Sequence, residues 1–354
     1  MHRFEKRLQF EARLATNIYG QIASIDAIKG QWRLANTLSP QMVQRLQTSV
    51  LVTSTGASTR IEGSKLSDKD VQALFRNQRI TKFRTRDEQE VGGYLEVLKT
   101  VFEQWRDISF TENTILGLHQ RMLHHSAKDV RHKGVYKLGS NRVEARDQDG
   151  QLVGIVFDPT PPHLVSKEMQ ELIDWTKQEL AGSTFPKLLV IANFVFEFLA
   201  IHPFQDGNGR LSRILTNLLL LQSDYAFCPF VSHEKIVEES KTDYYIALNK
   251  TQQSWKSDDE DLSPWLLFFL SVVGKQSEQA LVLMTEEPTE IFLSELQLQV
   301  WEYANSCETF SRKEIVDATG LNPRTVDHTL RKLVEMNKIE RFGQARATRY
   351  RLKK

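Results

Sequence analysis

Cysteine is scarce in this sequence, since Cys228 and Cys307 are the only two among its 354 residues. They lie far apart and belong to no CxxC or Cys/His cluster, which argues against a disulfide framework and against a zinc site. An export signal is lacking too, because Met1–Arg7 alternates charged and apolar residues without an apolar core. The longest apolar run, Leu188–Ile201, is shorter than the roughly 18 residues that a membrane span needs. These absences predict a cytoplasmic protein with no membrane segment.

Repeats with a period of roughly 20–50 residues and low-complexity segments are also missing, which argues against a solenoid. The apolar share of 40% and the charged share of 26% are typical of soluble globular proteins. A length of 354 residues predicts two or three domains. The net charge of +1 hides an uneven distribution, because residues 310–354 hold twelve Lys or Arg against five Asp or Glu. We therefore expect a basic unit at the C-terminal end.

Apolar residues recur at helical spacing through most of the chain, which predicts a mostly α-helical fold. Ser39-Pro40 and Ser263-Pro264 each offer an N-cap followed by a proline that suits the first helical turn. One region differs: Asn141–Ala145 and Gln151–Phe157 are rich in Val and Ile, and the polar turn Asp147–Gly150 separates them. We predict a single β-hairpin there, with helix resuming near residue 166.

The segment HPFQDGNGRLSR, residues 202–213, combines several features of a phosphate-handling site. Pro203 ends the preceding helix, because proline disfavours α geometry in the residue before it, and so His202 lies on a loop at a helix end. Gly207-Asn208-Gly209 comes directly before a second amphipathic pattern. Glycines at a helix N-terminus leave backbone N–H groups accessible, which makes an anion site.

Three charged residues complete the pattern. Asp206 lies beside the anion site, where a carboxylate can hold a magnesium ion that bridges phosphate oxygens. Arg210 and Arg213 are three residues apart on one helical face, so both can reach the same anion. A histidine with a near-neutral pKa can take the proton of an attacking hydroxyl. The segment lacks the GxxxxGK[ST] pattern of a P-loop, and we expect a different kind of phosphate-transfer site.

At every specified position the segment matches HPFx[DE]GNGRxxR, and it closely resembles the signature of the Fic family. The resemblance implies a protein adenylyltransferase, or AMPylator, which moves AMP from ATP to a Ser, Thr or Tyr hydroxyl of a protein. It implies that His202 is the general base, that Phe204 anchors the loop and that Asp206 holds Mg²⁺. The ATP phosphates would then be bound by the remaining signature residues: Gly207, Asn208, Gly209, Arg210 and Arg213.

Further segments resemble the same family. Gly134–Lys137 and the hairpin after it resemble the flap, here residues 139–158, that binds the backbone of a target protein as an added strand, although a purely structural hairpin fits the pattern equally well. Tyr244-Tyr245 resembles a pair in which Tyr245 lines the adenine pocket, while periodicity alone favours core packing. Position 209 is Gly, where the kinase-like Doc relatives carry Lys, and this favours transfer of AMP over transfer of phosphate.

Ser58–Gly63 fits [ST]xxxE[GN], the inhibitory motif of Fic proteins, in the N-terminal placement found in one subgroup. Glu62 falls at a helix C-terminus, where the macrodipole disfavours an anion, so we expect a cation beside it. The resemblance names Arg213 as that cation. Their pairing would remove Arg213 from the γ-phosphate, so we expect an autoinhibited enzyme that modifies itself once released.

Residues 290–354 have the pattern of a winged helix-turn-helix domain, with helices expected at residues 295–304, 312–318 and 324–337 and a wing after them. DNA and protein partners both remain open for it, and so does homo-oligomer formation. Residues that could contact DNA phosphates lie on the last helix and the wing: Arg324, Arg331, Lys332, Arg346, Arg349 and Arg351.

The expected organisation therefore has three parts: an N-terminal helical region with the inhibitory helix (1–105), a Fic catalytic domain with its flap (106–284) and the winged domain (290–354). Two alternatives stay open. The same site could remove AMP from a protein, with Glu62 orienting a water molecule. In the other alternative, the chain is a transcription regulator whose Fic unit only senses a nucleotide.

Overall fold

A computed structural model describes residues 2–34, 40–76, 83, 85–141, 143–146, 152–285, 293–343 and 348–353. The chain divides into two compact units, Met1–Leu281 and Val282–Lys354. Residues on both sides of the expected boundary at 105/106 thus pack in one unit, and that finer division stays a prediction. The expected boundary after residue 285 lies outside the described residues.

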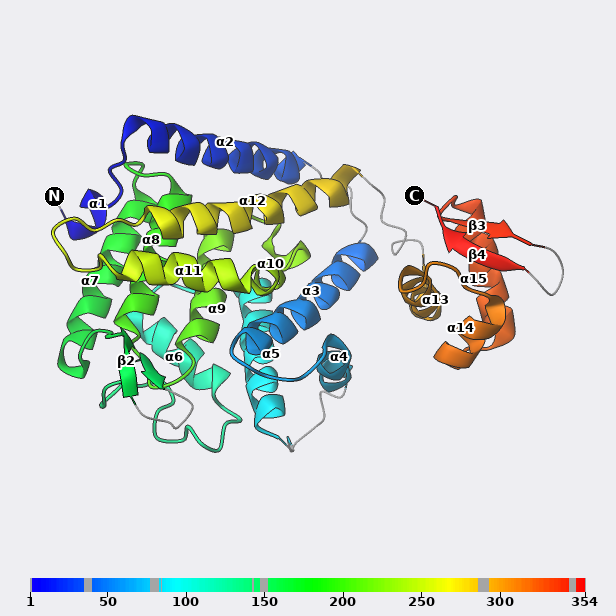
Figure 1. The fold of residues 1–354 in the computed structure, drawn as a ribbon, viewed down its shortest axis with the longest axis horizontal. Coiled ribbons are helices and arrows are strands. Elements are labelled where there is room, and N and C mark those ends of the chain that lie inside the picture. Colours follow the sequence, from blue (N-terminus) through cyan, green and yellow to red (C-terminus); the bar gives the residue numbers. More distant parts are fainter. Residues whose placement is uncertain are drawn as a thin grey trace. The chain divides into compact units, whose positions relative to one another are not determined.

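The first unit is helical apart from one pair of strands (Figure 1). Its N-terminal half contains α1 (Arg3–Lys6), α2 (Ala12–Leu34), α3 (Pro40–Ile61), α4 (Asp68–Arg76), α5 (Arg86–Gln104), α6 (Glu112–Met122), β1 (Val143–Arg146) and β2 (Leu152–Phe157). Its C-terminal half contains α7 (Pro162–Ala181), α8 (Lys187–Ile201), α9 (Asn208–Gln222), the 3₁₀ turn η1 (Cys228–Phe230), α10 (His233–Glu239), α11 (Lys241–Gln252) and α12 (Ser263–Thr285).

The centre of this unit is formed by α8 and α9. Every residue of α8 after Lys187 is buried, so the helix is apolar on all sides and needs neighbours all around it. It packs on α7 and α9, while α3 packs on α5 and α10. Residues 202–207 join the two central helices, and the loop that carries the signature is therefore fixed at both ends by the core.

A buried ion-pair network explains the polar residues within α8. Glu197 is fully buried, and it accepts hydrogen bonds from Arg7 Nη1 at 2.7 Å and from Trp255 Nε1 at 3.1 Å. Arg7 Nε donates to Asn193 Oδ1 at 2.7 Å. Burying a charge is costly unless it is paired and hydrogen-bonded. The N-terminal segment is thus held on the central helix by charges that sequence analysis did not connect.

The predicted hairpin is confirmed as an antiparallel pair, with Val143 opposite Phe157 and Arg146 opposite Leu152. Its predicted turn, residues 147–150, lies outside the described residues. The next helix, α7, begins at Pro162, four residues before the predicted start, with Pro161 as N-cap. Proline suits the first helical turn because the N–H group that it lacks would have no partner there.

The helix α12 is long and apolar enough to cross a membrane by length and composition, over Ser263–Met284. Core helices of soluble proteins pass the same test, and 44% of that window is buried inside the unit. Trp265 Nε1 donates to the carbonyl of Ala192 in α8 at 2.8 Å, and Gln276 Nε2 donates to the carbonyl of Val231 at 2.7 Å. We therefore interpret α12 as a core helix of this unit.

The second unit contains α13 (Glu295–Asn305), α14 (Arg312–Thr319), α15 (Pro323–Glu335), β3 (Ile339–Phe342) and β4 (Arg349–Leu352). Its three helices begin within a residue of the predicted positions, and β3 pairs with β4 in antiparallel register. Ile339 is buried and lies in β3, so the strand pair contributes to the core of this unit. The chain is therefore mostly helical with small antiparallel strand pairs, as predicted.

Candidate active site

The loop between α8 and α9 turns through two left-handed residues. His202 follows α8 with φ 51° and ψ 59°, a conformation that non-glycine residues rarely adopt. Gly207 has φ 84° and precedes the first residue of α9. A Cβ atom at Gly207 would approach Met122 Cε to 2.8 Å, a side-chain end that can shift, so the positive φ is the main reason for glycine here.

The loop is closed by Asn208 and anchored by Phe204. Asn208 Oδ1 accepts from the Phe204 N–H at 2.9 Å, and its Nδ2 donates to the Phe204 carbonyl at 2.8 Å. Phe204 is fully buried and stacks on His119, with ring centroids 3.8 Å apart. The side chain of Asn208 thus acts within the loop, and anion binding by the backbone N–H groups at the start of α9 stays a prediction.

The structure also brings His119 of α6 to the loop, which sequence analysis missed. The Gly134 N–H donates to His119 Nδ1 at 3.0 Å, so Nε2 must carry the proton that it shares with the Asp206 carbonyl at 3.0 Å. Burial lowers the pKa of His119 to about 4. A neutral histidine therefore connects the signature loop to the segment before the flap.

His202 has the opposite tautomer. Its Nδ1 lies 3.3 Å from the Leu199 carbonyl, which can only accept, so Nδ1 carries the proton and Nε2 keeps its lone pair. Burial lowers the pKa of His202 to about 4, a shift that Lys137 increases and that Glu62 and Asp206 oppose. The ring is therefore neutral at pH 7, and its free nitrogen can accept a proton.

Asp206 and Arg210 belong to a four-residue charge network. Arg210 is almost fully buried, and its guanidinium lies 3.1 Å from Asp206 Oδ1 and 3.0 Å from Glu90 Oε2. Arg86 lies 2.6 Å from Glu90 Oε1 and 3.2 Å from Asp206 Oδ2. The structure thus directs Arg210 toward carboxylates of its own chain, whereas a role on the ATP phosphates stays a prediction.

Arg213 is held by the end of α3. Its Nη2 lies 2.8 Å from Glu62 Oε1, and its Nε and Nη2 donate to the side chain and the carbonyl of Ser58 at 2.8 and 3.0 Å. Burial works against the charge, but Glu62 and neighbouring groups raise the pKa of Arg213 above its ordinary value. A Cβ atom at Gly209 would come within 2.2 Å of Glu62 Oε1. The carboxylate of Glu62 therefore lies against the first turn of α9, where a bound anion is favoured.

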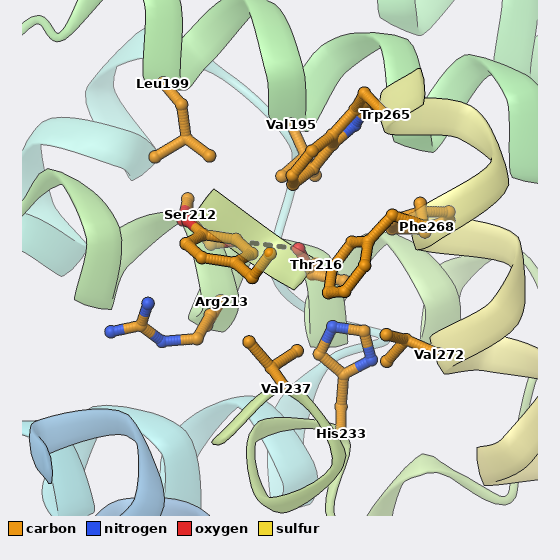
Figure 2. Close-up of a pocket in the computed structure, with 12 residues that line it drawn as sticks. Val195, Leu199, Ser212, Arg213, Thr216, His233, Val237, Trp265, Phe268 and Val272 are labelled. Atoms are coloured by element: carbon orange, nitrogen blue, oxygen red, sulfur yellow. Dashed lines mark hydrogen bonds between the residues drawn. The ribbon is translucent and has the colours of Figure 1, made fainter. Parts of the chain in front are cut away.

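The two tyrosines of α11 have different surroundings. Tyr244 is buried, and it lines a cavity of about 20 Å³ together with Arg213, His233 and Trp265. In Figure 2, Arg213 and Trp265 lie on opposite sides of this cavity, and the guanidinium of Arg213 points away from Trp265. Tyr245 is 44% exposed, so the core interpretation holds for Tyr244 and is wrong for Tyr245. A cavity of this volume has room for one water molecule but is too small for an adenine ring.

The basic residues of the second unit are only partly free. Arg349 lies 3.2 Å from Glu314 Oε1, and Arg351 is paired with Glu340 across the strands. Lys332 Nζ contacts Gln297 Oε1 at 3.3 Å, Arg324 is exposed, and Arg331 Nε contacts the Asp327 carbonyl at 3.4 Å. Arg346 lies outside the described residues.

The segment that contains this loop matches a known protein family. Residues 109–220 match the Fic/DOC family. The matched segment contains α6, the flap, α7, α8 and most of α9, and hence the whole signature. The matched segment thus covers the whole signature loop, while Glu62 lies before it.

Two proteins named as adenylyltransferases are similar to this chain at modest sequence identity. The chain is 26% identical over 127 residues to a probable protein adenylyltransferase of Aquifex aeolicus, which covers 35% of this chain and 39% of that protein. It is 26% identical over 229 residues to protein adenylyltransferase fic-1 of Caenorhabditis elegans, which covers 62% and 38%. The chain thus spans about two fifths of the length of these relatives.

A solved structure shares the fold over nearly the whole chain. The crystal structure of a Fic family protein from Desulfovibrio desulfuricans has a TM-score of 0.60 and 24% identity, and the alignment covers 95% of each chain. At this identity the likeness concerns the fold alone. The family match and the likeness to this solved structure agree in placing the fold of this chain among Fic proteins.

Proposed function

We propose that this chain transfers AMP from ATP to a hydroxyl group of a protein. The observation that carries the proposal is the neutral His202, whose Nε2 keeps its lone pair at a loop that also presents the N-terminus of α9. The names of the relatives support the same reaction class. The specific target and its modified residue are outside this proposal.

In the proposed mechanism, the hydroxyl oxygen of the target attacks the α-phosphorus of ATP and pyrophosphate leaves. Nε2 of His202 takes the hydroxyl proton as the new oxygen–phosphorus bond forms. The N–H groups at the start of α9 bind phosphate oxygens, and Arg213 stabilises the charge on the outer phosphates after it is freed from Glu62. Tyr245 would lie along the adenine, and the strands of residues 143–157 would hold the target backbone.

One feature of this site suits magnesium, namely a carboxylate beside the start of α9. Asp206 is partly exposed beside the start of α9, and the described residues contain no group of three or more His, Cys, Asp or Glu side chains that could hold a metal by themselves. Magnesium is usually bound by one or two carboxylates plus substrate phosphates, so Asp206 would be the protein's ligand. The bound ion would neutralise phosphate charge. Arg86 and Arg210 now contact both carboxylate oxygens, and at least one contact must loosen first.

Glu62 would restrain the reaction. Its carboxylate neutralises Arg213 and lies against the turn that would receive phosphate oxygens, so ATP with its γ-phosphate on Arg213 would compete with a built-in anion. Release of the end of α3 would free both positions. Self-AMPylation is then the simplest activity to observe, since the enzyme is its own nearest protein substrate.

The test uses purified protein with labelled ATP and magnesium. We expect Glu62→Gly to raise incorporation of label into the chain at least about tenfold, because a competing ion pair typically accounts for one or more kcal/mol. Glu239→Gly is the matched control, since it removes an exposed glutamate from the end of α10. Equal labelling of Glu62→Gly, Glu239→Gly and wild type, all folded, would contradict the restraint.

His202→Ala in the Glu62→Gly background separates the classes of function. An AMP transferase loses labelling to background, whereas a regulator that only senses nucleotide keeps its ATP affinity and has no labelling to lose. An AMP-removing activity would appear as loss of label from pre-modified protein, and it would depend on Glu62. The proposal is wrong if Glu62→Gly binds ATP and magnesium but transfers no AMP to itself or to proteins of a cell lysate.

A further inference from the structure

The left-handed backbone of His202 needs an explanation beyond the sequence of the loop. A non-glycine residue in this region costs on the order of 1–3 kcal/mol and persists only where the surroundings hold it. The preceding helix fixes one side, because the His202 N–H still donates to the Phe198 carbonyl at 3.0 Å. After this bond, the carbonyl groups of residues 201–204 have no N–H group of the helix to accept from. Each of them therefore needs another donor.

Each of the four carbonyl groups accepts from Lys137, just before the flap, or from Asn141 near its start, and the Phe204 carbonyl also accepts from Asn208. Lys137 Nζ donates to the Ile201 carbonyl at 3.1 Å, and the Lys137 N–H donates to the Pro203 carbonyl at 2.9 Å. Asn141 Nδ2 donates to the His202 carbonyl at 3.1 Å and to the Phe204 carbonyl at 2.8 Å. Lys137 Nζ also donates to Asn141 Oδ1 at 2.7 Å, which fixes the orientation of the amide. The two side chains and the backbone N–H of Lys137 thus form one clamp on four successive residues, of which the side chains hold residues 201, 202 and 204.

The clamp places a positive charge in an unusual position. Lys137 is 3% exposed, and its Nζ donates to two neutral oxygens, which offset only part of the cost of burying an ammonium group. Burial accordingly lowers the pKa of Lys137 to about 8, although Asp158 and Glu168 act in the opposite direction. A core position that costs free energy and serves only to hold backbone is expected where backbone geometry matters for function.

We propose that Lys137 and Asn141 are positioning residues for the proposed base, because they hold the backbone of residues 201–204 so that His202 stays left-handed and presents Nε2 to the substrate. The inference rests on the proposed function of His202. Lys137 and Asn141 donate to the carbonyl groups of residues 201–204 and not to the turn at 207–209 or to Arg213, so we expect their main effect to fall on the base. Displacement of a catalytic group by about 1 Å can cost about 100-fold in rate.

The test compares Lys137→Met and Asn141→Leu, both made in the Glu62→Gly background. Each change removes side-chain donors and keeps the approximate shape. We expect kcat for self-AMPylation to fall about 100-fold while KM for ATP changes less than about twofold, which is the signature of a group that acts only in the transition state. Lys137→Arg restores a donor and a charge, and should recover at least about a tenth of the lost rate. Lys177→Met and Asn17→Leu change exposed residues and serve as controls.

A second readout is independent of activity. In protein labelled with ¹³C-histidine, the His202 signals are assigned by comparison with His202→Ala, and their pH titration is followed. Lys137→Met should raise the pKa of His202 relative to the Glu62→Gly parent, because Lys137 is a cation that lowers it and Asp206 is present in both proteins. Both clamp variants should also move the ¹³Cα shift of His202, since its φ and ψ change.

The outcomes separate the two proposals. If Glu62→Gly transfers no AMP but the His202 signals move in both variants, the clamp stands and the transferase fails. If transfer occurs and both variants keep kcat and the His202 signals of the parent, the clamp is wrong. If kcat and KM change together and the ¹³Cα shift is constant, Lys137 and Asn141 are merely structural and the inference is also overturned.

Discussion

The ion pairs of the two units differ in burial and in the sequence separation of their partners. Around the signature loop, ion pairs join residues that are distant in sequence and mostly buried: Arg213 and Glu62 are 151 positions apart, and Arg7 and Glu197 are 190 apart. In the second unit the pairs are exposed and span fewer residues, with Arg349 and Glu314 35 positions apart and Arg351 and Glu340 11 apart.

The difference matters because burial determines how much an ion pair contributes to the free energy of unfolding. An exposed pair gains little over its hydration, whereas removing one member of a buried pair leaves a charge that has neither water nor partner. A count of basic residues suggested a phosphate-binding surface in the second unit, yet two of those arginines are paired with carboxylates. In the first unit a nearly neutral sequence contains the charges that hold the site together.

The largest expected effect comes from the buried network. Glu197→Ala should destabilise the first unit by about 3–5 kcal/mol, because the buried Arg7 would lose its nearer carboxylate and keep only Glu260, at 3.4 Å. Hydrogen exchange of the full chain, followed by mass spectrometry, reports the stability of each unit from its own peptides. Glu171→Ala, which removes an exposed carboxylate from α7, is the control. A loss below about 1 kcal/mol for Glu197→Ala would remove the contrast between buried and exposed pairs.

Acid should affect the first unit before the second. Burial lowers the pKa of His119 and His202 to about 4 and also lowers that of His233, so the unfolded chain binds more protons between pH 6.5 and about 4. The free energy of unfolding therefore falls as pH is lowered through this window, by on the order of 1 kcal/mol or more for each histidine.

The second unit contains one histidine, His328, and it is exposed. Urea unfolding of the full chain at pH 7, 5.5 and 4.5, read by hydrogen exchange in each unit, tests this difference. The prediction fails if both units lose stability in parallel across this range.

Local caps should matter equally in the two units. Ser311 Oγ accepts from the Glu314 N–H at 3.3 Å, and Glu314 Oε2 accepts from the Ser311 N–H at 2.9 Å. Thr85 and Glu88 form the same capping box at α5. Ser311→Ala and Thr85→Ala should each cost about 1 kcal/mol in their own unit. A much larger cost in one unit would show that the two differ in more than their long-range charges.

The smallest effect is expected for an exposed pair in the second unit. Arg351→Ala should change the stability of this unit by less than about 1 kcal/mol, because both partners are well exposed. Thermal unfolding in low and high salt checks it, since screening should remove most of any difference. A loss near that of Glu197→Ala would mean that the strand pair depends on this arginine.

Sequence analysis found the parts of the site that lie in one short segment. The helix end before His202, the glycine turn and the start of α9 follow from residues 202–213 alone, because caps, prolines and glycines act on their immediate neighbours. The hairpin and the helices of the second unit were predicted for the same reason. The pairing partner of Glu62 came from resemblance, and the electrostatics of a helix end required only that some cation be near.

The sequence by itself thus determined the elements, the signature loop and the kinds of chemical group that it carries. Only the tertiary structure decided which groups meet: Arg210 with Glu90, His119 with the Asp206 carbonyl, and Lys137 and Asn141 with the backbone around His202. The physical reason is that periodicity shows which face of a helix is buried but not which distant polar group it meets there. Those buried partners fix the tautomer, the charge and the backbone geometry that the loop needs.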